Sequence, residues 1–280
     1  VPFFHNSDAL LAKSDLDVVI IATPNSTHGK IAIDVIRRGR SVIIEKPAAG
    51  SVDELDQLMA EAERAGVYVY FAFHAAFANE VVWFRRWMAN EGSKLGRITG
   101  FHCSFYDPYI QANGTLISHA ESLGNCWIDS GVNALSVLNE FVELDLMKPA
   151  GIRFSYRPEK NTWTRAQAEF HLEGDGGSQD TPMGIIDTRW DLGVNFKQTQ
   201  LSFAEVGCKV LLDHSNQKVI IEESNGDQKL LADCSNERER LFNHYVNLFS
   251  DYLKCRHKKE FRGGEARKIH KLLYQFAKIK

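Results

Sequence analysis

Polar residues of this sequence stand where proton-transfer chemistry could be assembled. Lys46 follows the apolar run 42–44, His74 follows the apolar run 67–73, and Asp129 lies among apolar residues four positions before Asn133. A carboxylate accepts a proton near neutral pH, whereas a lysine with its ordinary pKa of about 10.4 is a poor base unless it is buried beside positive charge. These residue types therefore favour Asp129 as a general base and Lys46 as the group that orients a hydroxyl and stabilises developing negative charge.

The elements that would position Lys46 form a βαβ unit. Residues 41–45 contain three adjacent β-branched side chains, which is typical of a strand that is covered on both faces of a parallel sheet. A second apolar run, residues 17–24, ends at Pro24, and an apolar stripe between the two runs predicts a helix that stops at Gly39. This spacing indicates parallel strands joined by a right-handed crossover.

The segment after Lys46 predicts another helix and strand. Ser51 and Glu54 match a capping box, and Gly66 ends the apolar stripe that follows. The strand 67–73 then delivers His74 at its carboxyl end. Ligands of open α/β sheets bind at the carboxyl ends of the strands, so Lys46 and His74 should face the same rim.

The second part of the sequence has a different pattern. A helix at 79–90 and a strand at 97–106 precede a helix at 125–142, in which Asp129 and Asn133 would be neighbours, with Cβ atoms roughly 5–6 Å apart. Alternating apolar and polar residues between 152 and 223 predict an antiparallel sheet, and helices are expected at 236–257 and 264–279. The predicted fold class is α/β plus α+β, with domains at 1–96 and 97–280.

Composition excludes several function classes. The 280 residues are 44% hydrophobic and 25% charged, as in ordinary soluble globular proteins, and the net charge of -3 does not indicate nucleic-acid binding. No apolar run approaches the ~18 residues of a membrane helix. The five cysteines are scattered, which favours reduced thiols and a cytoplasmic location, and the histidines show no metal-ligand spacing, so we expect no metal.

Two short motifs resemble the Gfo/Idh/MocA family of NAD(P)-dependent oxidoreductases. They are Ala-Thr-Pro-Asn at 22–25, followed by His28, and Glu-Lys-Pro at 45–47, and the resemblance extends over essentially the whole chain. It implies a Rossmann-like parallel domain joined to a C-terminal domain with a large open, mainly antiparallel sheet. It also implies that Lys46 is catalytic and that NAD or NADP is contacted by a set of strand-end residues, namely Thr23, Pro24, Asn25, His28, Glu45 and Lys46.

Asn133 points to one branch of that family. Many members have a histidine four residues after the aspartate, and Asn133 in its place resembles the aldose 1-dehydrogenases acting on L-arabinose and D-galactose. In those enzymes the aspartate matching Asp129 is the acid/base, and the asparagine binds the sugar. Residues matching His74 and Asp107 line the sugar pocket there, whereas the tryptophan and histidine expected shortly after Asp107 are replaced by Ala112 and Asn113.

The implied reaction is oxidation of an aldose C1 hydroxyl to a lactone, with hydride transfer to a nicotinamide. The resemblance further implies a small-molecule sugar substrate and a homo-oligomer, dimer or tetramer, formed through the sheet of the second domain. The alternatives are another sugar or inositol dehydrogenase, and a cofactor-free or regulatory homologue. The latter is considered because no Gly-x-Gly-x-x-Gly turn precedes residue 17; we therefore expect an N-terminal truncation of about 30 residues or more.

Structural interpretations of the same residues also stay open. Lys46 and Asp129 could form only an interdomain ion pair, and Asn133 could cap or bridge helices. His74 could be an ordinary rim histidine, and Asp107 a turn residue before Pro108.

Overall fold

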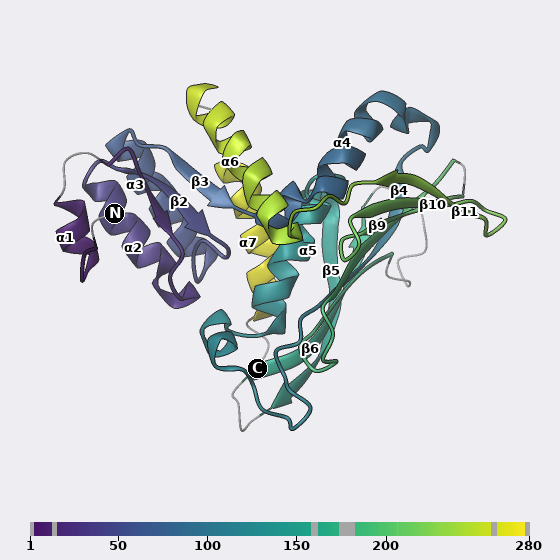
Figure 1. Cartoon of the computed structure of the whole chain (residues 1–280), viewed down its shortest axis with the longest axis horizontal. Helices are drawn as coiled ribbons and strands as arrows, with labels where there is room; N and C mark the ends of the chain where they lie inside the picture. The colour runs from purple at the N-terminus through teal and green to yellow at the C-terminus, as the bar shows by residue number, and fades with distance from the viewer. Residues whose placement is uncertain are drawn as a thin grey trace.

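Two β-sheets organise the chain, and helices occupy the space between and beside them (Figure 1). The computed structural model describes residues 3–12, 16–157, 162–173, 183–205, 207–258 and 262–277. The first sheet has three parallel strands in the order β1-β2-β3. Its strands and the helices that accompany them are β1 (Val18–Ile21), β2 (Ser41–Glu45), β3 (Val69–Ala72), α1 (Ser7–Leu11), α2 (His28–Arg37) and α3 (Val52–Ala65).

The second sheet has eight strands in the order β11-β10-β9-β8-β4-β7-β6-β5. Only the β4–β7 pair among these described strands is parallel. The predicted combination of a Rossmann-like parallel sheet and a large, mainly antiparallel sheet is thus confirmed. The strands are β4 (Ile98–Tyr106), β5 (Met147–Arg157), β6 (Thr162–Leu172), β7 (Gly184–Arg189), β8 (Phe196–Phe203), β9 (Lys209–Asp213), β10 (Lys218–Glu222) and β11 (Gln228–Asp233).

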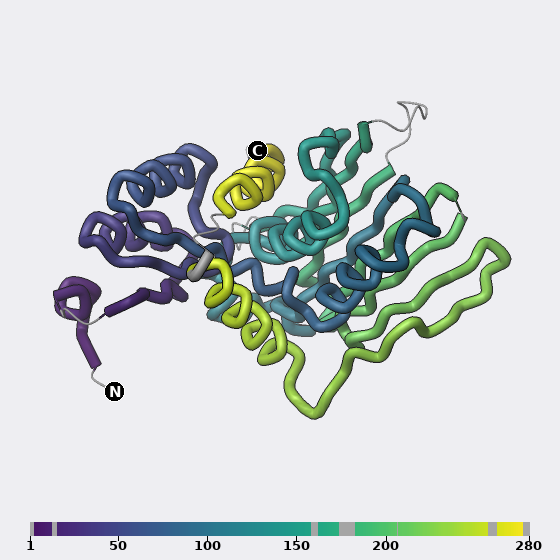
Figure 2. Tube along the Cα trace, turned by 90° about the horizontal axis from the view of Figure 1, so that it is seen from above, coloured from purple at the N-terminus to yellow at the C-terminus, as the bar shows by residue number. Residues whose placement is uncertain are grey.

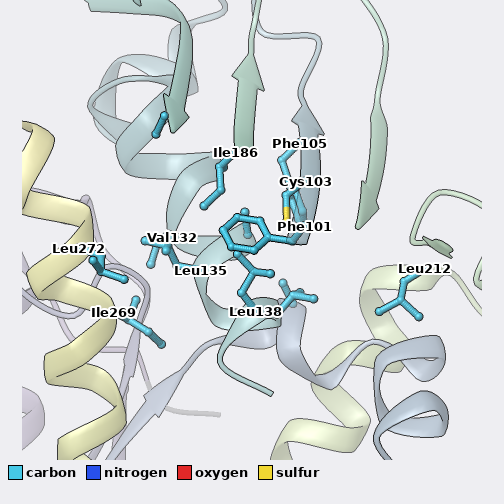
Figure 3. Packing of buried hydrophobic residues seen from close by; sticks show 14 of the residues in the cluster. Phe101, Cys103, Phe105, Val132, Leu135, Leu138, Ile186, Leu212, Ile269 and Leu272 are labelled. Carbon is cyan, nitrogen blue, oxygen red and sulfur yellow. The ribbon is translucent and has the colours of Figure 1, made fainter. Parts of the chain in front are cut away.

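Helices cover one face of the large sheet, as Figure 2 shows from above. The core beneath them combines Leu135 and Leu138 with Phe101 of β4 and Ile186 of β7 (Figure 3). Burial of these apolar side chains away from water stabilises the fold, since the hydrophobic effect is the main favourable term in folding. The four longer helices of this region are α4 (Asn79–Glu91), α5 (Val132–Leu138), α6 (Arg240–Lys258) and α7 (Gly263–Ala277).

The last two helices return to the first sheet and tie the two sheets together. In α6, Leu248 and Tyr252 pack with Ile43 and Tyr70 on one face of the parallel sheet. In α7, Ala266 belongs to the other core of that sheet, whereas Ile269, Leu272 and Leu273 join the core of the large sheet. Residue 279, the expected end of this helix, lies outside the described residues.

The start of α3 orders the segment that follows Lys46. Ser51 accepts a hydrogen bond from the main-chain N of Glu54 at 3.1 Å, and Glu54 accepts one from the main-chain N of Gly50 at 2.6 Å. Gly66 ends the helix at φ +65°, in the left-handed region that glycine tolerates best. The capping signals in the sequence therefore define both ends of this helix.

Truncation of Leu135 should weaken the large core. Leu135 is fully buried on α5, so Leu135→Ala should lower the free energy of unfolding by about 2–5 kcal/mol through lost burial and a cavity. Urea titration followed by circular dichroism measures the effect. The matched control is Leu253→Ala on α6, where the side chain is 54% exposed and the change should be within about 0.5 kcal/mol. Equal losses in the two variants would contradict the packing described here.

Candidate functional site

Lys46 and Asp129 meet directly between the two sheets. The Lys46 Nζ lies 2.5 Å from Asp129 Oδ1 and 3.1 Å from the main-chain O of the same residue. Both side chains are largely buried, with exposed fractions of 12% and 5%. The pairing places an ammonium group and a carboxylate at the carboxyl end of β2, where the strand-end argument expected Lys46.

Asp129 lies in a π-helical turn rather than in the regular α-helix expected over residues 125–142. The turn spans Trp127–Gly131, and regular α-helix begins only at Val132. Two contacts from outside the helix accompany this widening: Lys46 donates to the Asp129 main-chain O, and Ser130 Oγ donates to Asp107 Oδ2 at 2.9 Å. Single π turns inside α-helices are frequent at functional sites.

Asp107 is held by a second buried lysine. Lys197 Nζ donates to Asp107 Oδ1 at 2.6 Å, to Asn195 Oδ1 at 2.7 Å and to the main-chain O of Tyr106 at 3.2 Å. Burial lowers the pKa of Lys197, and the nearby Asp107 carboxylate opposes that effect. With Ser130 on its other oxygen, the Asp107 carboxylate accepts hydrogen bonds on both oxygens.

His74 lies against residues of α6. Its Nδ1 is 3.3 Å from His244 Nδ1, and its ring stacks on Tyr245 at a centroid distance of 5.6 Å. Burial sets the pKa of His74 well below its ordinary value, and the positive charge of Lys46 adds to this effect. Burial likewise lowers the pKa of His244 to about 3. Both imidazoles are therefore neutral near pH 7 and can exchange hydrogen bonds with hydroxyl groups.

Tyr245 connects α6 to the strand that presents Lys46. Its hydroxyl donates to Glu45 Oε1 at 2.5 Å, and Glu45 Oε2 accepts from the main-chain N of Lys46 at 3.2 Å. Glu45 is therefore held by α6. Its predicted contact with a cofactor stays a prediction.

Asn133 has an unsatisfied buried acceptor. The residue is 7% exposed, and its Oδ1 has no hydrogen-bond partner in the part of the chain that the structure describes. Tyr109 lies near the two aspartates of the site: burial raises the pKa of its phenol, and the negative charges of Asp129 and Asp107 raise it further. A buried amide oxygen without a partner costs about 1–3 kcal/mol, so this position suits a ligand that brings a donor.

The end of β1 forms the other side of the site. Thr23 and Pro24 are exposed, while Asn25 donates from Nδ2 to the main-chain O of Leu123 at 3.1 Å. His28 is buried, with its ring nitrogens 2.8 Å from the Pro47 main-chain O and 2.7 Å from the Thr23 main-chain O. His28 therefore clamps the two strand-end loops together, and its predicted contact with a cofactor stays a prediction.

These residues fit the nicotinamide end of NAD or NADP. Exposed main chain at 22–24 lies beside the β2 end that presents Lys46, and the His28 clamp fixes the two loops relative to each other. Thr23, Pro24 and Asn25 would hold the nicotinamide side of the cofactor against Lys46. Ligands of open α/β sheets bind at the carboxyl ends of the strands, where these residues lie.

The loop after Lys46 is supported by α7. The main-chain N of Ala48 donates to His270 Nε2 at 3.2 Å, and Tyr274 donates to the main-chain O of Ala49 at 2.6 Å. A groove of about 640 Å³ lies on the outer side of this loop, lined by residues that include Ile128 and Lys271. Neither Lys46 nor Asp129 lines the groove, so it is separate from the ion pair.

A carboxylate–imidazole–hydroxyl chain also occurs away from the ion pair. His214 Nδ1 is 2.7 Å from Glu80 Oε1, and its Nε2 is 2.9 Å from Thr199 Oγ1. This order of groups resembles that of nucleophilic triads. Glu80 and Thr199 are fully buried, however, so no substrate reaches the hydroxyl, and the chain instead connects α4 to the sheet.

Sequence reasoning missed several residues of the site, namely Lys197, Ser130, Tyr109, His244 and Tyr245. A signal existed for Lys197, because it occupies an inward position of β8, whose burial alternates along the strand. A lysine at an inward position is rarely buried without a partner. The remaining four residues have no comparable pattern in the sequence.

Within the described residues, no group of three or more His, Cys, Asp and Glu side chains could hold a metal ion. No helix among them has both the length and the apolar character needed to cross a bilayer. The five cysteines are all free.

The N-terminal part of the chain is similar to a known oxidoreductase family. Residues 1–73 match the Gfo/Idh/MocA model, described as an oxidoreductase family with an NAD-binding Rossmann fold. A glycosyl hydrolase family 109 protein from Shewanella sp. (strain ANA-3) is 44% identical over 55 residues, which are 20% of this chain and 12% of that protein. The scyllo-inositol 2-dehydrogenase (NADP(+)) IolU of Bacillus subtilis is 26% identical over 106 residues, 38% of this chain and 32% of the relative.

A solved structure shares the whole fold. UDP-N-acetylglucosamine 3-dehydrogenase GnnA from Acidithiobacillus ferrooxidans has a TM-score of 0.74 and 17% identity, covering 97% of this chain and 80% of that chain. The curated relatives, by contrast, are matched over less than half of their length. Together, the family model and the curated relatives show that the N-terminal part of this chain is similar to the NAD-binding Rossmann domain of Gfo/Idh/MocA oxidoreductases.

Protonation of His270 should make stability depend on pH. Burial lowers the pKa of His270 to about 4, below its ordinary value of 6.5. The unfolded chain therefore binds more protons between these values, so stability should fall by about 3 kcal/mol as the pH drops from 6.5 to 4. Urea titrations across this range measure the slope.

The control compares two substitutions. His270→Gln should reduce the slope because it removes the titrating group, while His102→Gln, at an exposed position on β4, should leave it unchanged. An unchanged slope in His270→Gln would show that other groups cause the acid sensitivity.

Proposed function

We propose that this chain is an NAD(P)-dependent sugar dehydrogenase that oxidises the C1 hydroxyl of an aldose, such as galactose or arabinose, to a lactone. The observation behind the proposal is the Lys46–Asp129 pair, 2.5 Å apart at the carboxyl rim of the parallel sheet, together with the unsatisfied Oδ1 of Asn133, four residues after Asp129. The ion pair brings a base and a cation to one point, and the Asn133 oxygen needs a hydrogen-bond donor. A sugar carries several hydroxyl donors.

The chain's own groups would handle the proton. Asp129 accepts the proton of the C1 hydroxyl, and Lys46 holds the same oxygen while negative charge develops on it. The bound nicotinamide supplies the acceptor for the hydride that leaves C1. Because both side chains are largely buried, their interactions with the substrate oxygen are stronger than in water.

Neutral groups would select the sugar. Asn133 Oδ1 accepts from a sugar hydroxyl, and His74, neutral near pH 7 because its pKa is lowered, hydrogen-bonds to another. Asp107 can bind a third hydroxyl through its remaining lone pairs, since a carboxylate offers about four acceptor positions. This arrangement favours an uncharged polyol over an anionic substrate.

A second candidate is a dehydrogenase acting on a cyclic polyol. It is favoured by the similarity to the scyllo-inositol 2-dehydrogenase, which extends over 106 residues. An inositol ring presents the same hydroxyl donors to Asn133 and the same acidic proton to Asp129. Activity on a panel of aldoses, inositols and nucleotide sugars separates these substrates, and absence of any NAD(P)H formation would favour a non-catalytic homologue.

We also propose a homo-oligomer, a dimer or tetramer, formed through the face of the large sheet that the helices leave uncovered (Figure 2). That face carries residues of intermediate exposure, among them Gln198 and Gln200 of β8. A stable interface needs roughly 1,200–2,000 Å² in total, which an eight-stranded sheet can provide.

Substitution of Asp129 should remove the base. Asp129→Asn should lower kcat by about 10²–10⁴-fold on the best substrate of the panel, because the amide cannot accept the proton. The rate of NAD(P)H formation, followed by absorbance at 340 nm, gives kcat. Asp187→Asn is the matched control: this carboxylate is also buried, but its partner is the Tyr106 hydroxyl on the large sheet rather than Lys46. Wild-type turnover in Asp129→Asn would reject the assignment.

Removal of the Asn133 amide should weaken sugar binding. Asn133→Ala should raise KM by about 10-fold, the equivalent of one hydrogen bond of about 1.4 kcal/mol. Steady-state kinetics on the same substrate give KM and kcat separately. Asn139→Ala, at the end of the same helix, should leave both unchanged. An unaltered KM in Asn133→Ala would exclude Asn133 from the sugar site.

A further inference from the structure

A second lysine–aspartate pair, Lys197 and Asp107, is connected to the Lys46–Asp129 pair through the hydroxyl of Ser130. Lys197 Nζ binds Asp107 Oδ1, Asp107 Oδ2 accepts from Ser130 Oγ, and Ser130 is the residue after Asp129. The chain thus runs from β8 to the end of β4 and into the π-helical turn. It ends on the residue adjacent to the proposed base.

The chain is rigid because each of its polar atoms is used. All three donors of the Lys197 ammonium have acceptors, at 2.6, 2.7 and 3.2 Å. The side chains of Lys197 and Asp107 are 11% and 9% exposed, and Ser130 is fully buried. Buried charges are costly to separate, so movement of Asp107 away from Lys197 is strongly disfavoured.

The π-helical turn needs such support. A π turn interrupts the regular α-helical ladder, and here tertiary contacts hold it on both sides of Asp129. Lys46 binds the main-chain O of Asp129 from one side, and Asp107 binds Ser130 from the other. Loss of the Ser130 contact removes one of these two restraints and lets the Asp129 carboxylate move relative to Lys46.

We propose that Lys197 is a positioning residue that acts through Asp107 and Ser130 to fix the Asp129 carboxylate in its contact with Lys46. Its importance for turnover rests on the proposed dehydrogenase function, whereas its effect on the Lys46–Asp129 pair does not. In this role Lys197 determines the position of the base, Asp129, but does not contact the reacting hydroxyl.

Ser130→Ala is the principal test, because it removes a single oxygen and leaves the Lys197–Asp107 pair intact. Lys197→Met is the second variant and removes the charge at the far end of the chain. Ser136→Ala is the matched control: Ser136 is also buried, on the adjoining helix α5, but its hydroxyl donates to the main-chain O of Asn133 rather than to Asp107.

The first readout needs neither substrate nor cofactor. In protein labelled with ¹⁵N at the lysine side-chain nitrogen, the Lys46 signal is assigned by its disappearance in Lys46→Arg. Ser130→Ala and Lys197→Met should shift this signal and speed its hydrogen exchange, while Ser136→Ala should leave it at the wild-type position. An unmoved Lys46 signal in Ser130→Ala overturns the proposal, and so does an equal shift in the control.

The second readout separates positioning from binding. With a substrate that the wild type oxidises, Ser130→Ala should lower kcat by about 10–100-fold, because a small misplacement of a catalytic group has effects of this size. KM and the affinity for NAD(P)H should stay within about two-fold of wild type. Loss of cofactor affinity instead of kcat overturns the proposal. If the wild type oxidises no sugar, the dehydrogenase function fails, and the Lys46 signal alone decides the role of Lys197.

Discussion

The contact between Lys46 and Asp129 is the interaction on which the arrangement of the two sheets depends. Removing two charges from water is costly, and the attraction between them compensates only when their geometry is good. The 2.5 Å contact therefore constrains the end of β2 and the π-helical turn to one relative position. The two terminal helices satisfy that constraint: α6 bonds to the first sheet through Tyr245 and Glu45, and α7 through Tyr274 and the Ala49 main chain. Because the same helices pack against the cores of both sheets, they keep Lys46 close to Asp129.

Neighbouring residues hold the two segments that carry Lys46 and Asp129. On the lysine side, Glu45 accepts from the Lys46 main chain, and His270 accepts from the Ala48 main chain. On the aspartate side, the restraint passes through Ser130 to Asp107 and Lys197. Hydrogen bonds to buried groups contribute about 1 kcal/mol each, but losing one leaves a buried polar atom unpaired at greater cost. The site is therefore preorganised, in the sense that its charged groups are already oriented before any substrate arrives.

Local patterns predicted the parts of the fold that local interactions determine. The β-branched run before Lys46 and the Ser51–Glu54 caps gave the correct strand and helix, because burial on both faces and helix-end hydrogen bonds are encoded within a few residues. The strand-end rule predicted the position of Lys46, whereas the role of Asp129 was suggested by its residue type and by a family resemblance. The π-helical turn was not, since it depends on Asp107, 23 residues away from Ser130. Lys197 was missed for the same reason: its partner is brought to it by the pairing of β4 with β8, strands that are not consecutive in the chain.

The pairing of the charges has a consequence for recognition. Lys46 is matched by Asp129, and Lys197 by Asp107, so these four groups present no net charge to a ligand. His74 and His244, with lowered pKa values, are neutral near pH 7 and do not attract an anion either. Discrimination then falls to directional groups, of which the Asn133 amide oxygen is the clearest because it is buried without a partner. A site that hydrogen-bonds a substrate hydroxyl rejects analogues lacking it far more strongly than an apolar pocket rejects a missing methylene. Under the proposed function, the number and stereochemistry of hydroxyl groups, rather than charge, should therefore determine which molecule places its oxygen between Lys46 and Asp129.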